Sequence, residues 1–160
     1  NGYFCFMDQI SYDQALSKAM ALCSKAEKCS FDIRKKLEEW RVAPQDIPRM
    51  IKRLIDDRFV DDERYARFFV RDKFRFNHWG KIKIGYMLRG KQFSEELILQ
   101  AFSEIDEYTY VETLIKILRD KTKNTKFVNE YDRKAKLVRF AQSRGFEPEL
   151  IHRYLSEAID

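Results

Sequence analysis

The 160-residue chain contains little of what β-sheet, disulfide-linked or membrane proteins are built from. Five glycines and three prolines leave little material for frequent β-turns. No apolar run approaches the ~18 residues of a membrane-spanning helix, so we expect no membrane association. The three cysteines are an odd number without a Cys-x-x-Cys pair. This pattern favours a reduced cytoplasmic protein, and we interpret Cys23 as a buried structural thiol.

Motifs for catalysis and for metal binding are also missing. No phosphate-binding loop, dinucleotide-binding glycine motif or His-Glu-x-x-His sequence occurs. The two histidines, His78 and His152, have no second ligand at metal-binding spacing. The acids around Asp61 and Asp62 could in principle hold Mg²⁺, but capping of helix ends explains them more simply. We therefore expect no enzyme activity, no metal and no cofactor.

One apolar and charged pattern occurs three times along the chain. In each copy an apolar residue precedes a charged stretch, a second apolar residue, an acidic step and a pair of apolar residues. The copies are LEEWRVAPQDIPRMIKRL from Leu37, LRGKQFSEELILQAF from Leu88 and AQSRGFEPELIHRYL from Ala141. Self-similarity at a period of ~50 residues is typical of stacked helical units, which present long surfaces to large partners.

Almost the whole chain has the spacing of amphipathic helices. Ser11 and Gln14 form a capping box, Pro44 is placed to begin a third helix, and Gly145 is placed to end an eighth. We predict an all-α fold of nine helices in three tandem three-helix repeats, forming an elongated, curved, monomeric array. The expected divisions are an N-terminal tail and three repeats: 1–10, 11–60, 61–106 and 107–160.

The net charge of +5 conceals strong segregation of charge along the chain. Residues 67–93 carry +7 with a single acid, residues 94–115 carry −6, and residues 116–144 carry +7. Basic segments of this kind favour a polyanion or an acidic protein surface. Ordinary charged helix surfaces would explain the amount of charge but not its segregation. We expect the charge of residues 67–93 to be poorly neutralised locally.

A ridge of arginines is the most specific feature of the expected fourth helix, which begins near Asp61. The arginines are three, four and four residues apart and fall within an arc of about 80°: Arg64, Arg67, Arg71 and Arg75. Guanidinium groups beside aromatic rings suit phosphates, carboxylates or bases. The alternative is a solvated face. We expect Phe68 and Phe74 to flank the ridge. The aromatic residues expected in the core are Tyr65, Phe69 and Phe76.

The segment after this helix extends the basic surface. Gly80 is placed to begin a helix whose first turn contains Lys81 and Lys83, and cations there oppose the helix dipole. A bound anion at the exposed backbone N–H groups would offset that cost. Trp79 either stacks on a partner or packs half-buried at the junction. The candidate partner- or nucleic-acid-binding residues are Arg64, Arg67, Arg71, Lys73, Arg75, Trp79, Lys81, Lys83, Arg89, Lys91, Lys123 and Lys126.

The segment FVDDERYARFFVRDKFRFNHWGKIKI, from Phe59 to Ile84, resembles the RecX family of recombination regulators. The resemblance extends over nearly the whole chain beyond about Ser11, and RFNHWG is similar to the version in Bacteroidetes-type bacteria. One departure is RGKQF at Arg89, where Gly90 lies three places before Phe93 instead of next to it.

The resemblance implies tandem three-helix repeats and a regulatory function. A member of this family would bind the RecA–DNA filament and inhibit the ATPase, recombinase and coprotease activities of RecA, without a cofactor or a catalytic residue. Two alternatives remain open at this point. The chain could be a basic helical-repeat module that binds single- or double-stranded DNA without RecA, or a helical-repeat adaptor for another partner.

Overall fold

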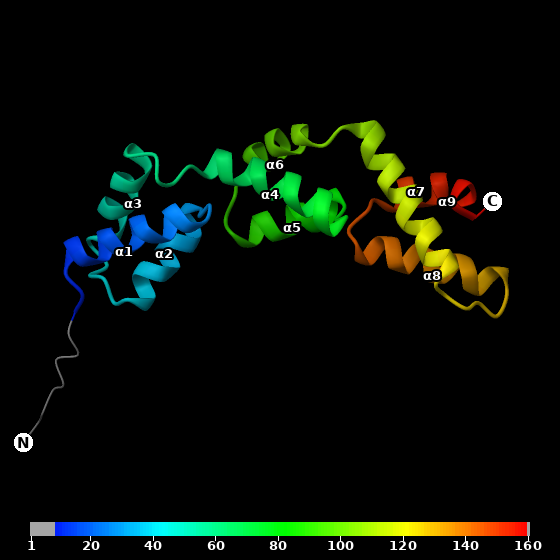
Figure 1. The fold of residues 1–160 in the computed structure, drawn as a ribbon, viewed down its shortest axis with the longest axis horizontal. Helices are drawn as coiled ribbons and strands as arrows, with labels where there is room; N and C mark the ends of the chain where they lie inside the picture. The colour runs from blue at the N-terminus through cyan, green and yellow to red at the C-terminus, as the bar shows by residue number, and fades with distance from the viewer. Residues whose placement is uncertain (1–8, 160) are drawn as a thin grey trace, which may run out of the picture. The chain divides into compact units, whose positions relative to one another are not determined.

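The structure is a computed structural model that describes residues 9–159. Over this range every regular element is helical: nine α-helices and one short 3-10 turn, without a strand (Figure 1). None of these helices has the length and apolar character needed to cross a bilayer. The all-α prediction is therefore confirmed. Of the expected N-terminal tail, residues 1–8 lie outside the described residues.

The chain divides into two compact units, one ending at Tyr65 and the other beginning at Ala66. The first unit contains a first group of three helices. They are α1 (Tyr12–Lys25), α2 (Ser30–Glu39) and α3 (Ile47–Asp56). The capping box is confirmed, because the Ser11 hydroxyl accepts from the Gln14 N–H (3.2 Å) and the Gln14 side chain accepts from the Ser11 N–H. Buried apolar residues from all three helices form the core: Ala15, Ala19, Ile33, Leu37, Met50, Ile51 and Leu54.

The predicted start of the third helix at Pro44 is wrong. The helix begins at Ile47 with Pro48 in its first turn, while Pro44 lies in the preceding turn. Both prolines suit a helix start, because a missing N–H costs nothing there. Pro48 favours the later start, because in a helix from Pro44 it would lie in the interior, where it has no N–H to donate to the Pro44 carbonyl.

The second group of helices continues along the chain. It comprises α4 (Asp62–Asn77), which crosses the boundary between the two units, α5 (Lys81–Gly90), α6 (Glu95–Ala101) and the 3-10 turn Phe102–Glu104. Ser94 caps α6 by accepting from the Leu97 N–H (3.3 Å). The core of this group is formed by Ala66, Val70, Phe74, Ile84, Leu88 and Ile98.

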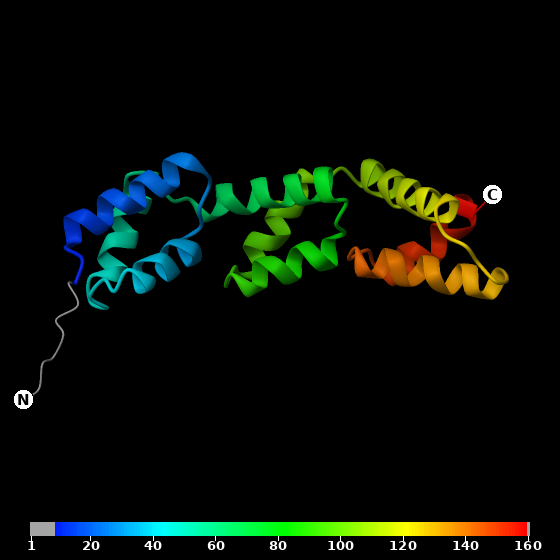
Figure 2. The same cartoon turned by 60° about the horizontal axis from the view of Figure 1, so that its bottom comes forward.

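The third group comprises α7 (Glu107–Lys123), α8 (Glu130–Ser143) and α9 (Pro148–Ile159). All three helices pack against one another, as both ribbon views show in yellow to red (Figures 1 and 2). Asp106 and Asn129 cap α7 and α8 with their side-chain oxygens. Gly145 follows α8 at φ +92°, which confirms the predicted left-handed residue at this helix end.

Two aromatic residues of α4 face the opposite way from the prediction. Phe74 is buried, whereas Phe76, expected in the core, is 69% exposed. Ala66, Val70 and Phe74 follow one another at four-residue spacing, so Phe74 continues the buried stripe. Phe76 lies about 160° around the helix from Phe74 and therefore faces outward.

The nine helices form groups of three along the described residues. The boundaries of the repeats at 60/61 and 106/107 and the curved, elongated shape stay predictions.

Candidate partner-binding site

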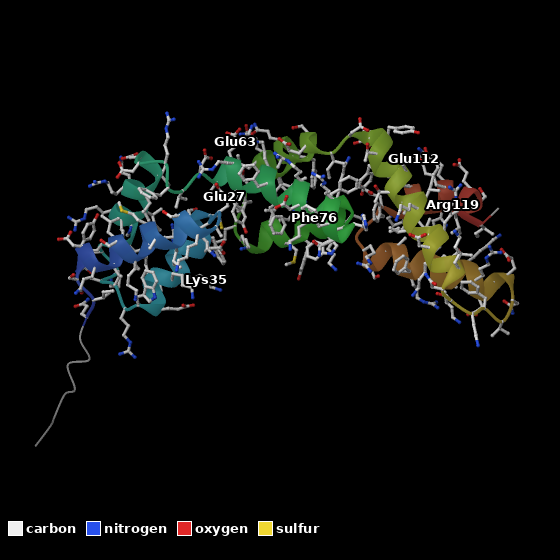
Figure 3. All side chains as sticks on the ribbon, viewed as in Figure 1. Glu27, Lys35, Glu63, Phe76, Glu112 and Arg119 are labelled. Carbon is white, nitrogen blue, oxygen red and sulfur yellow. The ribbon has the colours of Figure 1, made fainter. Side chains whose placement is uncertain are left out.

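Arg64 has a structural partner in the first unit. Its Nε donates to Glu27 Oε1 (2.8 Å), and both side chains are about 30% exposed. Glu27, labelled in Figure 3, lies in the connection between α1 and α2. Arg64 therefore joins two segments of the first unit.

Three further candidate cations form ion pairs with the acidic segment 94–115. Arg71 bonds Glu104 (3.2 Å), Lys81 bonds Glu107, and Arg89 makes a two-pronged contact with Glu95. The Arg89 hydrogen bond also holds the pKa of Glu95 below its ordinary value. The expectation that residues 67–93 are poorly neutralised is therefore wrong for these three positions. The fold brings acids of α6, of the 3-10 turn and of the start of α7 beside cations of α4 and α5. A sum of charges along the sequence does not show these pairings.

A cluster of uncompensated cations remains around Trp79. The ammonium groups of Lys73 and Lys83 lie 5.0 Å and 4.5 Å from the centroid of the half-buried Trp79 ring. Arg75 lies over Phe76, which Figure 3 labels on α4, at 5.5 Å. Within residues 9–159 no carboxylate pairs with any of these three cations. We call Lys73, Trp79 and Lys83 the Trp79 cluster. It combines positive charge with an aromatic face.

The predicted anion site at the start of α5 is wrong. Three N–H groups at the start of α5 already have acceptors in the third group: Gly80 donates to the Arg144 carbonyl (2.7 Å), Lys81 to the Tyr110 hydroxyl (2.9 Å) and Ile82 to the Gly145 carbonyl (3.0 Å). Protein oxygens thus take the positions that an anion would occupy at these three N–H groups.

Tyr110 is the central side chain of this junction between the second and third groups. Its hydroxyl donates to Glu147 Oε2 (2.7 Å) while accepting from the Lys81 N–H, and its ring packs between Phe74 and Phe146, with centroids at 5.7 Å and 5.0 Å. Burial, together with the Glu147 hydrogen bond, raises the pKa of Tyr110 far above its ordinary value. Sequence reasoning missed this residue, because no local spacing connects Tyr110 with Lys81 or Glu147.

The remaining candidates lie in different places. Arg67 is exposed on α4, and Lys91 is half-buried just after α5. Lys123 and Lys126 are exposed at and beyond the C-terminal end of α7. Lys123 lies about 20 Å along the helix axis from Tyr110, because α7 rises ~1.5 Å per residue. Lys123 therefore lies at the far end of α7 from Tyr110, whose hydroxyl accepts from the Lys81 N–H.

The acids near the start of α4 have structural roles. Asp61 accepts from the Arg64 N–H (2.9 Å), and Asp62 accepts from both the N–H and the hydroxyl of Ser30 (2.7 and 2.5 Å). In the described part of the chain no group of three or more metal-ligating side chains occurs. These contacts support the interpretation of the acids as helix-end caps.

Comparisons with known proteins agree with this architecture. Residues 61–101 match the RecX second three-helix domain and residues 108–155 the RecX third three-helix domain. The regulatory protein RecX of Vibrio vulnificus is 32% identical over 87% of this chain and 89% of its own length. That of Clostridium perfringens strain 13 is 30% identical over 82% of this chain, which spans 62% of the length of that relative.

A solved structure has the same fold. RecX from Lactobacillus salivarius superimposes with a TM-score of 0.81 over 91% of this chain and 95% of its own, at 18% identity. The tandem three-helix organisation expected from the repeats is thus found in both the family models and a crystal structure. The chain belongs to the RecX family of regulatory proteins.

Proposed function

We propose that this protein binds the RecA–DNA filament and inhibits the ATPase, recombinase and coprotease activities of RecA. The observation that carries the proposal is the Trp79 cluster, where cations without a carboxylate partner surround an aromatic ring in a chain of a regulatory family. Such a cluster attracts an acidic or phosphate-bearing partner, because its charge is not neutralised within the protein.

The junction between the second and third groups supports this proposal. Backbone hydrogen bonds from Gly80 and Ile82 to the Arg144–Gly145 turn hold the start of α5 in place. Lys83 follows directly in the same turn of α5, so its backbone position is set before any partner arrives. A binding surface that is already ordered loses less conformational entropy on association.

We also propose that the protein acts as a cytoplasmic monomer without intrinsic catalysis. The charged residues near the helix starts are occupied in caps and ion pairs, as described for Asp61, Asp62 and Arg64. Regulation would then consist of binding alone, with the free energy of association opposing the conformational changes of the filament.

A RecA ATPase assay on single-stranded DNA tests the proposal. The wild-type protein should lower the rate of ATP hydrolysis and, without RecA, hydrolyse no ATP. Arg67→Ala combined with Arg71→Ala should raise the concentration needed for half-inhibition about tenfold, because two cations of the exposed α4 face are removed. Surface changes of this kind alter stability by only about ±0.5 kcal/mol.

The matched control is Lys52→Ala combined with Arg53→Ala on α3. These cations are also exposed and ion-paired, with Asp56 and Asp57. The control should inhibit like the wild type, and both double variants should keep the wild-type melting temperature. Equal inhibition by the α4 variant and the control would show that the α4 arginines are a solvated face without a part in binding.

Direct DNA binding is the second candidate function. The Trp79 cluster favours it, since a ring flanked by ammonium groups suits base stacking and phosphate contact. Binding of this type would need no RecA and would weaken steeply with salt. Titration of a labelled oligonucleotide at two salt concentrations, with and without RecA, separates the two candidates.

A further inference from the structure

Exposed apolar side chains concentrate in the second group. Of the ten large hydrophobic side chains that are exposed among the described residues, six lie in this group: Phe68, Phe76, Ile82, Tyr86, Met87 and Leu99. Single exposed apolar residues are ordinary on protein surfaces, but several on one face of a helix mark an interaction site. Three of the six belong to the ten-residue helix α5.

The outer face of α5 is apolar over a broad arc. Ile82, Tyr86 and Met87 are 50%, 73% and 39% exposed. With ~100° per residue, these three and Lys83 span an arc of about 140°. The inner face, with Ile84 and Leu88, is fully buried. Gly90 lies within the outer arc, and a Cβ placed there would meet no atom within 4 Å, so this part of the face is open.

The charge on α5 is distributed unevenly. Lys81 and Arg89 form ion pairs with Glu107 and Glu95. Lys83, which lies inside the apolar arc, has no carboxylate partner among residues 9–159, and its ammonium group lies over the Trp79 ring. The single uncompensated charge of the helix therefore lies among its exposed apolar side chains, where a carboxylate of a partner would complement it.

We propose that the outer face of α5, formed by Ile82, Lys83, Tyr86 and Met87, docks on a protein surface that is apolar and acidic. Tyr86 and Ile82 would be buried in the contact, and Lys83 would meet a carboxylate. The inference rests on the proposed function, in which that partner is the RecA filament. It adds the apolar outer face of α5 to the contact made by the Trp79 cluster, with which this face shares Lys83.

A protein suits this face better than a nucleic acid. Tyrosine and methionine are enriched at the centres of protein interfaces, where they fill apolar pockets. Single-stranded nucleic acids are instead bound by stacking bases on aromatic rings and by neutralising phosphates. Ile82 and Met87 offer no stacking surface, and the arc contains one cation only.

The test compares Ile82→Ala/Tyr86→Ala with the control Tyr108→Ala/Val128→Ala. Tyr108 is 74% exposed, which matches Tyr86, and Val128 is 88% exposed; both lie in the third group. Fluorescence anisotropy measures binding of labelled protein to RecA filaments on single-stranded DNA. The α5 variant should bind at least about tenfold more weakly at both low and high salt, because apolar contacts are not screened. The control should bind like the wild type, and both should keep wild-type helicity.

Lys83 provides the test of the acidic chemistry. Lys83→Glu should weaken filament binding about tenfold or more through like-charge repulsion, whereas Lys83→Arg should bind within about twofold of the wild type. Equal binding by Lys83→Glu and the wild type would show that the partner surface opposite Lys83 is not acidic and would overturn that part of the proposal.

The outcomes separate this inference from the proposed function. If the wild type does not bind filaments, both fall. If the wild type binds and the α5 variant binds equally well, the assignment of the contact to α5 is wrong while the proposed function stands. Loss of binding to a free oligonucleotide in the α5 variant would assign the face to nucleic acid instead. A wild-type dimer in sedimentation that dissociates on Ile82→Ala/Tyr86→Ala would assign it to a second copy of the chain.

Discussion

Gly145→Ala is expected to destabilise the second unit by about 3 kcal/mol or more. Gly145 has φ +92°, which an L-residue with a side chain adopts only under strain. A Cβ at this position would lie 2.2 Å from Lys83 Cβ and 2.6 Å from the Lys83 N atom. The turn cannot move away without losing the hydrogen bond from the Ile82 N–H to the Gly145 carbonyl.

Gly80, whose backbone lies against that of Gly145, should respond to an alanine substitution in the same way. A Cβ at Gly80 would lie 2.2 Å from the Gly145 carbonyl oxygen, so the two backbones are in contact at this point. Gly80→Ala therefore requires the start of α5 to separate from the Arg144–Gly145 turn. We expect Gly80→Ala to lower the free energy of unfolding by about 3 kcal/mol, an amount similar to that expected for Gly145→Ala.

Gly90→Ala is the matched control for both variants. Gly90 ends α5, and a Cβ there meets no atom within 4 Å. The free energy of unfolding should stay the same or rise by up to about 1 kcal/mol, because alanine is favoured over glycine in helices. Urea titrations followed by circular dichroism compare the three variants. Gly145→Ala with the stability of Gly90→Ala would contradict the close backbone approach.

Tyr110→Ala should cost about 3–5 kcal/mol of stability, because it empties a fully buried position between Phe74 and Phe146. Tyr110→Phe keeps the ring and removes only the hydroxyl. It should cost about 1–3 kcal/mol, since the Lys81 N–H loses its acceptor and the Glu147 carboxylate loses its donor. Urea unfolding of both variants measures the two costs. Stability of Tyr110→Phe equal to that of the wild type would show that these two hydrogen bonds do not hold the junction together.

The stability difference between the wild type and Tyr110→Phe should depend on pH. The ordinary pKa of 10.0 applies to Tyr110 in the unfolded chain, and the folded protein holds the pKa far above it. Above about pH 10 the unfolded state therefore binds fewer protons than the folded state, and stability falls as pH rises. Below that pH the contribution is complete. The advantage of the wild type over Tyr110→Phe should be constant from pH 7 to about pH 9 and shrink above about pH 10. If the stability difference between the wild type and Tyr110→Phe stayed constant above about pH 10 as well, that result would contradict the burial of the hydroxyl.

Local features of this protein follow from the amino-acid sequence alone. The Ser11 cap, the left-handed Gly145, the helix start at Gly80 and the all-α repeats were predictable. Each depends on interactions within a few residues of the chain, such as a side-chain oxygen three residues from an N–H or a periodicity of 3.6. The threefold repetition, which also carries the family resemblance, is visible in the sequence itself.

Only the tertiary structure decided which of the candidate residues remain available to a partner. Lys81 meets Glu107, which is 26 residues away, and Tyr110 meets Glu147, which is 37 away. The N–H groups at the start of α5 find acceptors at Arg144 and Gly145, so the anion site expected there does not exist. The prediction placed Phe76 in the core, whereas the structure buries Phe74. The two aromatic residues are close in sequence, and each fits an apolar stripe. Contacts of this kind depend on how helices dock, and docking is determined by burial summed over many residues and not by the spacing of any one segment.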